Sequence, residues 1–457
     1  MNQTDQKATD IFEKAPIPRA VLQNALPAMA AMLMMLIYNL ADTFFIGQTG
    51  DAYQVAAVSL AMPVFLIFMS VGTIFGLGGT SVISRALGEG RLEYARKVCA
   101  FCMWSCIGIG ILMAVCFELF IDQILYIVGA SVDTWQYAKS YLSIVSIGGP
   151  FVLINNCYSN VVRAEGHSVQ AMTGQLLGNL MNVILDPIMI LGFGWNITGA
   201  AIATVVGNIM GASYYILYFI RGKSTLSAHP KDFTLKNGIC INVLVIGIPA
   251  ALGSILMSIS QIIINSQMSA YDDMAVAGMG VAMKVVTITG MVSMGLGQGV
   301  QPLLGYCVGA KLWNRFKKSF SFSIAFALGL SLVLTAICYL FNGQIVGAFL
   351  TDPDAYAYAV QFSRILLTTS SLFGVFYVLI NTLQAMGAAT PALIINLSRQ
   401  GIIFIPALFI LHSILGITGL VIAQPVADIL SIILAAILCM YSFRKLTSSS
   451  KKEICEA

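Results

Sequence analysis

The residues best suited to carry chemistry in this chain are two carboxylates inside long apolar stretches. Asp42 lies in the segment 26–47, LPAMAAMLMMLIYNLADTFFIG, and Asp186 lies in the segment TGQLLGNLMNVILDPIMI. A charged side chain at membrane depth costs roughly 2.5 kcal/mol or more, so such residues usually face a cavity or a partner rather than lipid. Both acids are therefore candidates for binding a proton or a cation.

Asp186 ends a stripe of polar side chains. Four residues follow the spacing i, i+4, i+7, i+11, which places them on one helix face: Gln175, Asn179, Asn182 and Asp186. Pro187 cannot donate a hydrogen bond, so a backbone oxygen is freed beside the acid. Carboxylate and amide oxygens suit a proton or a hard cation such as Na⁺. The alternative is that each acid only caps or pairs locally near the outer surface, as Asp42 could do near a helix end.

The second half of the chain has a comparable stripe without a charge. Its members share the same spacing: Ser254, Ser258, Gln261 and Asn265. They would either line a substrate cavity, with Gln175 from the first half, or hold helices together through hydrogen bonds. Lys284 is a further cavity candidate, because its counterpart in the first half is the neutral Pro63.

Arg399 and Asp428 each stand near the middle of a predicted helix. Two opposite charges at membrane depth compensate each other, so a structural ion pair is favoured over a role in transport.

Enzyme and metal motifs are missing from the sequence. HExxH and GxSxG do not occur, and the GKS at 222–224 lacks the glycine of a phosphate-binding loop. Cys99, Cys102 and Cys106 open an apolar helix without a nearby histidine, so they are interpreted as small apolar residues. We expect no enzymatic activity, no bound metal and no organic cofactor.

The composition indicates a membrane protein. The 457 residues are 58% hydrophobic and only 10% charged, with a mean hydropathy of +0.86, whereas soluble proteins carry about a quarter charged residues. The net charge of +4 does not suggest a nucleic-acid partner.

Twelve apolar runs are long enough to cross a membrane as helices. Because the runs are continuous rather than alternating, transmembrane strands are not indicated. We predict an all-α integral membrane protein with spans at 22–45, 56–84, 98–120, 138–160, 169–191, 198–220, 241–268, 276–304, 319–341, 357–382, 390–411 and 417–442.

The second half of the chain repeats the first. VAAVSLAMPV (55–64) matches VAGMGVAMKV (276–285), and TGAAIA (198–203) matches TGLVIA (418–423). Each half holds an even number of spans, so both enter the membrane the same way and the repeat is parallel. In the second half Asp42 corresponds to an isoleucine, Ile263 or Ile264, which indicates that only the first lobe carries this acid.

The predicted domains follow from the repeat. They are an N-terminal tail at 1–20, a first lobe at 21–220, a linker at 221–240, a second lobe at 241–442 and a C-terminal tail at 443–457. Pro27 and Pro249 occupy matching places early in the two lobes and are candidate helix hinges. The segments IFGLGGTS and MGLGQGV are expected to let helices pack closely.

The orientation follows from the basic residues. One set of loops collects 20 of the 24 lysines and arginines. Basic loops stay in the cytoplasm, so both termini, both tails and the linker are predicted to be cytoplasmic, in the inner (cytoplasmic) membrane of a bacterium.

Several segments together resemble the MATE (multidrug and toxic compound extrusion) transporters. They are YNLADTFFIG, the LAMP/VAMK pair, GLGQGVQPLLGYCVGAK, LSRQGIIFIP and IAQPVADI, and the QPLLGY and RQG segments are closest to the bacterial MepA-like branch. The resemblance covers essentially the whole chain. It implies two six-helix bundles that form a V around a central cavity.

The resemblance also implies multidrug efflux by antiport, in which a drug leaves as H⁺ or Na⁺ enters through one lobe. In similar proteins an acid on the first helix and an Asn-x-x-x-Asp on the fifth form the cation site, which here are Asp42, Asn182 and Asp186. Tyr38, Tyr141 and Thr204 match further site positions less closely. The expected partners are a small organic substrate and the lipid bilayer, with the chain as a monomer. The alternative function is a flippase for lipid-linked sugars or other amphiphiles.

Overall fold

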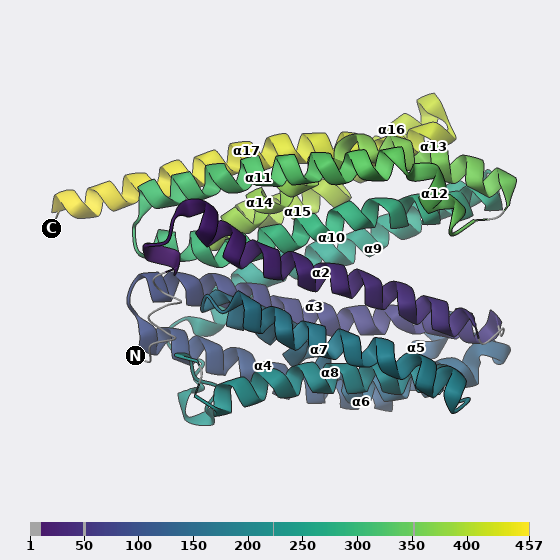
Figure 1. The fold of residues 1–457 in the computed structure, drawn as a ribbon, viewed down its shortest axis with the longest axis horizontal. Coiled ribbons are helices and arrows are strands. Elements are labelled where there is room, and N and C mark those ends of the chain that lie inside the picture. Colours follow the sequence, from purple (N-terminus) through teal and green to yellow (C-terminus); the bar gives the residue numbers. More distant parts are fainter. Residues whose placement is uncertain (1–10, 49–51, 223, 351, 457) are drawn as a thin grey trace. The chain divides into compact units, whose positions relative to one another are not determined.

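The computed structural model describes residues 11–48, 52–222, 224–350 and 352–456. Within these ranges helix follows helix and no strand occurs (Figure 1), so the predicted all-α fold class is confirmed. Residues 1–10 and 457, the outer parts of the two predicted tails, lie outside the described residues.

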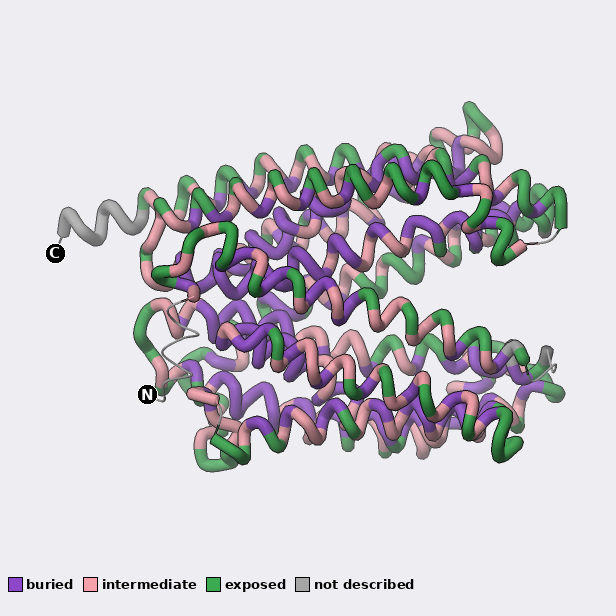
Figure 2. Tube along the Cα trace, viewed as in Figure 1, coloured by how far each residue is buried: buried purple, intermediate pink, exposed green. Residues whose placement is uncertain are grey.

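The predicted transmembrane spans have counterparts in the structure. Eleven helices among the described residues are long and apolar enough to cross a membrane, and the bent pair α13 (Pro353–Ser370) and α14 (Phe373–Ala385) meets the same criterion when the two helices are taken together. Large apolar side chains remain exposed along these helices, such as Leu112 at 62% and Ile433 at 53%, and Figure 2 shows exposed positions recurring along their lengths. Lipid is the solvent that such faces require.

The expectation of one continuous helix at 357–382 is wrong. The helix axis bends by 48° between α13 and α14. Just before the bend, Ser370 donates a side-chain hydrogen bond to the Leu366 carbonyl oxygen over 3.3 Å. Hydroxyl groups that compete for backbone carbonyl oxygens in this way often bend helices.

The described chain divides into two compact units. Unit 1 comprises Met1–Lys14 and Ala30–Gly247, and unit 2 comprises Ala15–Met29 and Ile248–Ala457. We describe each by itself.

In unit 1 the long helix α6 packs against α3, α4 and α8, and α7 packs mainly against α8. The elements of unit 1 are most of α2 (Ile17–Gly47), α3 (Ala52–Gly88), α4 (Leu92–Leu119), α5 (Ile121–Ile127), α6 (Val132–Ala164), α7 (Ser168–Asp186), the π-helix η1 (Pro187–Gly192), α8 (Asn196–Ile220), the short 3₁₀-helix η2 (Pro230–Asp232) and the start of α9 (Ile239–Ser269).

In unit 2 the long helix α10 packs against α13, α14 and α11. The contact of α10 with α13 and α14 is the repeat counterpart of that between α3 and α6. The elements are the start of α2, most of α9, α10 (Asp273–Gly309), α11 (Trp313–Leu340), α12 (Asn342–Gly347), α13, α14, α15 (Ala389–Leu397), the π-helix η3 (Ser398–Ile402), α16 (Phe404–Leu415) and α17 (Ile417–Glu456).

Helices α2 and α9 each begin in one unit and continue in the other. Close packing of their first parts relies on glycines. A Cβ on Gly299 of α10 would lie 2.6 Å from Ala25 Cα of α2, and one on Gly78 of α3 would collide with the Val243 carbonyl oxygen of α9. The expectation that the two glycine-rich segments allow close helix packing is therefore confirmed.

Candidate functional site

The site is built where α7 loses its regular helical form. Asp186 is the last residue of α7, and Pro187 opens the π-helix η1. Proline has no N–H to donate to the preceding turn, and single π-turns inside α-helices often occur at functional sites. Asp186 is completely buried, and neither carboxylate oxygen has a hydrogen-bond partner among the residues that the structure describes.

Asp42 of α2 belongs to the same cluster. Its side chain is 8% exposed, and its Oδ1 atom is buried without a hydrogen-bond partner. The two carboxyl groups are close enough to interact electrostatically, and both also interact with the Tyr141 hydroxyl of α6. Two buried acids close to each other repel, so a positive charge that binds between them is strongly attracted.

Two amide and hydroxyl groups connect the acids to α8. Asn182, one turn before Asp186, donates from Nδ2 to Thr204 Oγ1 over 3.2 Å. Both side chains are buried, and Asn182 Oδ1 has no partner. Tyr38, one turn before Asp42, also interacts with Asp42, Asp186 and Thr204. The structure thus brings together six predicted cation-site residues: Tyr38, Asp42, Tyr141, Asn182, Asp186 and Thr204.

The other two polar positions of α7 lie further from the acids. Asn179 is half-buried, and no hydrogen bond joins it to the cluster within the described part of unit 1. Gln175 is also half-buried, and its Oε1 atom has no partner.

Sequence reasoning missed two asparagines that extend the cluster. Asn208 of α8 donates to the Thr204 backbone oxygen over 2.9 Å, and its own Oδ1 accepts from Asn155 of α6 at 3.1 Å. Asn155 Oδ1 has no partner. The available signal was Asn208 four residues after Thr204 in an apolar helix, since polar residues so placed share a helix face.

The polar stripe of unit 2 makes hydrogen bonds within its own helix. Ser258 donates to the Ser254 carbonyl oxygen over 3.3 Å, and Gln261 donates to Asn265 Oδ1 over 3.2 Å. Lys284 is exposed, and its ammonium lies 5.2 Å from the centre of the Phe349 ring. The role of these residues as a substrate surface stays a prediction.

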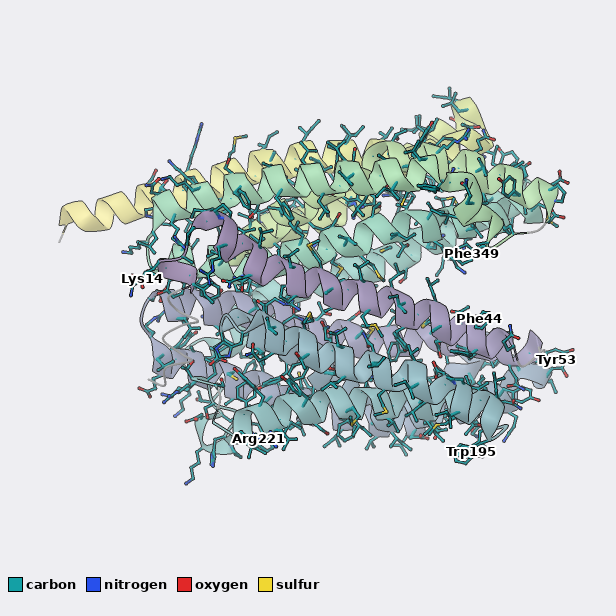
Figure 3. All side chains as sticks on the ribbon, viewed as in Figure 1. Lys14, Phe44, Tyr53, Trp195, Arg221 and Phe349 are labelled. Atoms are coloured by element: carbon teal, nitrogen blue, oxygen red, sulfur yellow. The ribbon has the colours of Figure 1, made fainter. Side chains whose placement is uncertain are left out.

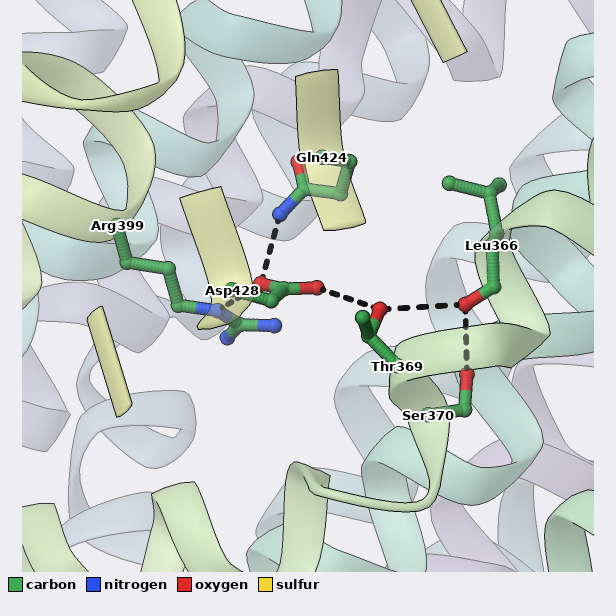
Figure 4. A network of polar contacts seen from close by, with 6 residues as sticks. All are labelled: Leu366, Thr369, Ser370, Arg399, Gln424 and Asp428. Atoms are coloured by element: carbon green, nitrogen blue, oxygen red, sulfur yellow. Dashed lines mark hydrogen bonds and ion pairs between the residues drawn. The ribbon is translucent and has the colours of Figure 1, made fainter. Parts of the chain in front are cut away.

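Arg399 and Asp428 lie together inside unit 2 (Figure 4). Arg399 Nε is 2.7 Å from Asp428 Oδ1, and the two side chains are 12% and 1% exposed. Gln424 Nε2 donates to the same oxygen over 3.0 Å, and Thr369 donates to Oδ2 over 3.4 Å. Asp428 therefore has partners on both oxygens, unlike Asp186.

The two candidate hinges lie inside continuous helices. Pro27 is within α2, and Pro249 is within α9. Each stands within three residues of the point where its helix passes from one unit to the other. Whether the helices bend there during function stays a prediction.

The described residues contain no group of three or more His, Cys, Asp or Glu side chains arranged to hold a metal ion. Cys99, Cys102 and Cys106 are fully buried in α4 as apolar core residues. The candidate cation site of unit 1 thus combines two carboxylates with neutral oxygen donors, which are the types of ligand that protons and hard cations prefer.

Comparison with solved structures defines the class of protein. The fold matches a structure described as the outward-facing conformation of a multidrug resistance MATE family transporter of the MOP superfamily. The TM-score is 0.91 at 21% identity, covering 99% of each chain. The chain therefore has the same fold as that structure.

Comparison with sequence families is more specific. The family model MatE matches residues 27–188 and again 249–410, one match in each half. The chain is 32% identical over 446 residues to the multidrug export protein MepA of Staphylococcus aureus (strain MSSA476), covering 97% of this chain and 98% of that protein. It is 32% identical over 450 residues, with the same coverage, to MepA of Staphylococcus haemolyticus (strain JCSC1435). The chain belongs to the MatE family.

Proposed function

We propose that this protein exports organic, often cationic and amphipathic compounds in exchange for H⁺ or Na⁺. The observation that carries the proposal is the pair of buried acids in unit 1, with three carboxylate oxygens that lack a partner. A buried, uncompensated negative charge is costly, so this cluster is stable when a proton or a cation neutralises it. The named function of the similar proteins, multidrug export, supports the substrate class.

The coupling would work through the free energy of charge burial. With a cation bound, Asp42 and Asp186 are neutralised, and the conformation in which α2, α7 and α8 exclude water from them is favoured. Without it, the acids favour a state in which water reaches them. Cation and substrate must each bind the two states of the transporter with different affinities, since a ligand with equal affinity for both shifts nothing.

The donors fit either coupling ion. Sodium would take oxygens from Asp42, Asp186 and Asn182, and a proton would bind one carboxylate and donate to the other. Tyr38 and Tyr141 would close the site, because their hydroxyl groups interact with Asp42.

The proposed location is the inner membrane, with both termini cytoplasmic and the chain acting as a monomer. The basic residues support this orientation within unit 1. Figure 3 places Lys14 and Arg221 at one end of the unit, and Tyr53 and Trp195 at the other. Basic residues remain on the cytoplasmic side.

The flippase alternative receives less support. A site for pyrophosphate groups requires free basic side chains, whereas Arg399 is already paired with Asp428. We therefore retain the antiporter as the proposed function.

The decisive experiment is efflux of a cationic dye from proteoliposomes that contain the purified protein. A pH gradient and a Na⁺ gradient are imposed separately, with the membrane potential clamped. Dye efflux driven by at least one gradient is expected. If neither gradient accelerates efflux over protein-free liposomes, the antiport proposal is rejected.

A further inference from the structure

The buried acid of unit 2 differs from those of unit 1 in having a complete set of partners. Arg399 Nε and Gln424 Nε2 donate to Asp428 Oδ1, and Thr369 Oγ1 donates to Oδ2 (Figure 4). In unit 1, by contrast, both oxygens of Asp186 are buried without a partner. Asp428 already has a positively charged partner, and Asp186 has none among the described residues.

The guanidinium of Arg399 is fixed in place from several sides. It lies 5.0 Å from the centre of the Phe373 ring and 4.5 Å from that of Phe376, both in α14. Tyr377, the other titratable group with which it interacts, lies on the same helix. Stacking on aromatic rings and pairing with a carboxylate suit a planar guanidinium, which stays charged at any working pH.

The network is located where two spans of unit 2 depart from regular helix. Thr369 is next to the end of α13, and Phe373 begins α14 after the 48° bend. Arg399 itself belongs to the π-helix η3. The ion pair therefore connects the bend, the π-turn and α17, and its loss would affect all three.

The internal repeat shows that this network is specific to unit 2. At the offset of 221 residues that relates VAAVSLAMPV (55–64) to VAGMGVAMKV (276–285), Arg399 corresponds to Gly178. A Cβ on Gly178 would lie 2.8 Å from the Gly207 carbonyl oxygen, so a longer side chain there would require α7 and α8 to separate. Counting from the matched Thr198 and Thr418, Asp428 corresponds to the neutral Asn208.

The acids of unit 1 are likewise missing from unit 2. Asp186 corresponds to Ala407, and Asp42 corresponds to Ile263 or Ile264. Ile264 is part of the apolar core of unit 2, with Ile263 packed against it. The acids Asp42 and Asp186 of unit 1 and Asp428 of unit 2 thus stand at different positions of the repeat, and Asp428 is the one that is paired with an arginine.

From these contacts we infer that Arg399 is an internal counter-ion of Asp428. Arg399 neutralises the buried acid of unit 2, as an exchangeable cation neutralises the buried acids of unit 1. The inference rests on the proposed function. It deepens that function by restricting cation exchange to the site of Asp42 and Asp186. Unit 2 keeps the same charge throughout the cycle, because its cation is covalently part of the chain.

The test removes the counter-ion in a protein whose unit 1 site is already neutral. The purified variants are D42N/D186N, D42N/D186N/R399M and D42N/D186N/R399M/D428N. The melting temperature of each is measured in NaCl and in choline chloride at equal ionic strength, and again at falling pH.

The D42N/D186N protein should melt at the same temperature in both salts. Adding R399M should create a response to Na⁺ or to acid of at least about 2 °C, since a bound ion stabilises the folded state. Adding D428N should abolish that response. The inference is overturned if R399M creates no response, or if D42N/D186N alone retains a response that D428N removes.

A second pair of variants covers the case in which R399M does not fold. R399L/D428L replaces the pair by apolar side chains, which a buried site often tolerates, and R399K keeps the charge without the planar group. Both are expected to retain the wild-type number of cations exchanged per dye molecule in proteoliposomes. Loss of gradient-driven efflux from folded R399L/D428L would overturn the inference.

A different set of results would contradict the proposed antiport function itself. In that case wild-type protein shows no gradient-driven efflux, or D42N/D186N transports as well as wild type, whatever the Arg399 variants do.

Discussion

At the residue scale, Asp186 and Asp428 differ in their partners rather than in their burial. Both are almost completely buried, yet Asp428 receives three hydrogen bonds and Asp186 receives none. A buried charge with partners stabilises a fixed arrangement, whereas one without partners depends on a ligand. The cluster around Asp186 can therefore be tested by substituting its charged and its neutral members separately.

Replacing either acid of unit 1 by asparagine should abolish gradient-driven efflux. An asparagine side chain has the same shape as aspartate but no charge to attract a cation, so the two states would no longer be coupled to the gradient. The measurement is dye efflux from proteoliposomes, with the melting temperature as a check on folding.

The matched control for both substitutions is Asp122→Asn. Asp122 forms a surface ion pair with Lys139 at 2.7 Å, and such pairs contribute at most about 1 kcal/mol. This variant should transport like wild type. Undiminished efflux from both D42N and D186N would contradict a cation site in unit 1.

Thr204→Val should weaken cation binding without abolishing transport. Valine has the shape of threonine but cannot accept the hydrogen bond from Asn182 Nδ2. A buried donor left without a partner costs about 1–3 kcal/mol. The cation concentration for half-maximal efflux should therefore rise about tenfold, while the maximal rate is retained. An unchanged half-maximal concentration would show that Asn182 and Thr204 do not position the site.

At the element scale, close packing and irregular helices position the cluster. The π-helix η1 follows Asp186 directly, and α7 approaches α8 through two glycines. A Cβ on Gly207 would lie 2.6 Å from the Gly178 carbonyl oxygen and 3.2 Å from Asn182 Cβ. The spacing of these helices therefore sets the position of the Asn182 side chain.

Gly207→Ala should destabilise the protein by about 1–3 kcal/mol, because the added methyl group meets a backbone atom that cannot rotate away. It should also raise the cation concentration needed for efflux, since Asn182 is displaced. Thermal unfolding and efflux measure the two effects.

Gly108→Ala provides the matched control, because nothing lies within 4 Å of a Cβ at this helical position. Alanine is a better helix former than glycine, so this variant should be at least as stable as wild type. If Gly207→Ala and Gly108→Ala have the same stability and need the same cation concentration for efflux, the close approach of α7 and α8 at Gly207 does not position Asn182.

The helix hinges make a separate prediction. Pro27→Ala and Pro249→Ala restore the N–H donors to the carbonyl oxygens of Gln23 and Val245, so α2 and α9 should become stiffer and no less stable. Efflux should slow several-fold while the melting temperature is unchanged or higher. Pro63→Ala, in α3, serves as the control and should leave the rate unaltered. Wild-type rates in both hinge variants would exclude bending at these positions.

At the scale of the whole molecule, duplication followed by divergence explains the distribution of function. The same family model matches both halves, and corresponding helices form the main contact in each unit. The acids, however, occupy different positions in the two halves. The same fold therefore holds a buried pair of acids in unit 1 and an acid paired with an arginine in unit 2.

The orientation of the whole chain can be tested with single cysteines. Val132→Cys should react from outside intact cells with a membrane-impermeant maleimide, because Val132 is 95% exposed. Lys236→Cys, which is also at an exposed position, should react only after the membrane is permeabilised. The reverse pattern would place the termini outside and contradict the distribution of basic residues.

The sequence by itself determined the helical class, the spans and the duplication. Long apolar runs have one stable solution in lipid, because every backbone polar group must be satisfied within its own segment. It also determined that Asp42, Asn182 and Asp186 were candidates, since charged and amide groups in such runs are costly. The break at 357–382 and the partner Asn155 could not be predicted, because they depend on contacts between helices, and the signal for Asn208 was limited to its spacing from Thr204.

Only the tertiary structure decided which groups each buried acid contacts. The sequence favoured an ion pair between Asp428 and Arg399 and a cation site at Asp186, but it did not show the hydrogen bonds of either acid. The three-dimensional contacts give Asp428 a guanidinium, an amide and a hydroxyl group, and leave Asp186 with none. The physical reason is that the cost of a buried charge depends on the groups within hydrogen-bonding distance, and those come from segments far apart in the chain.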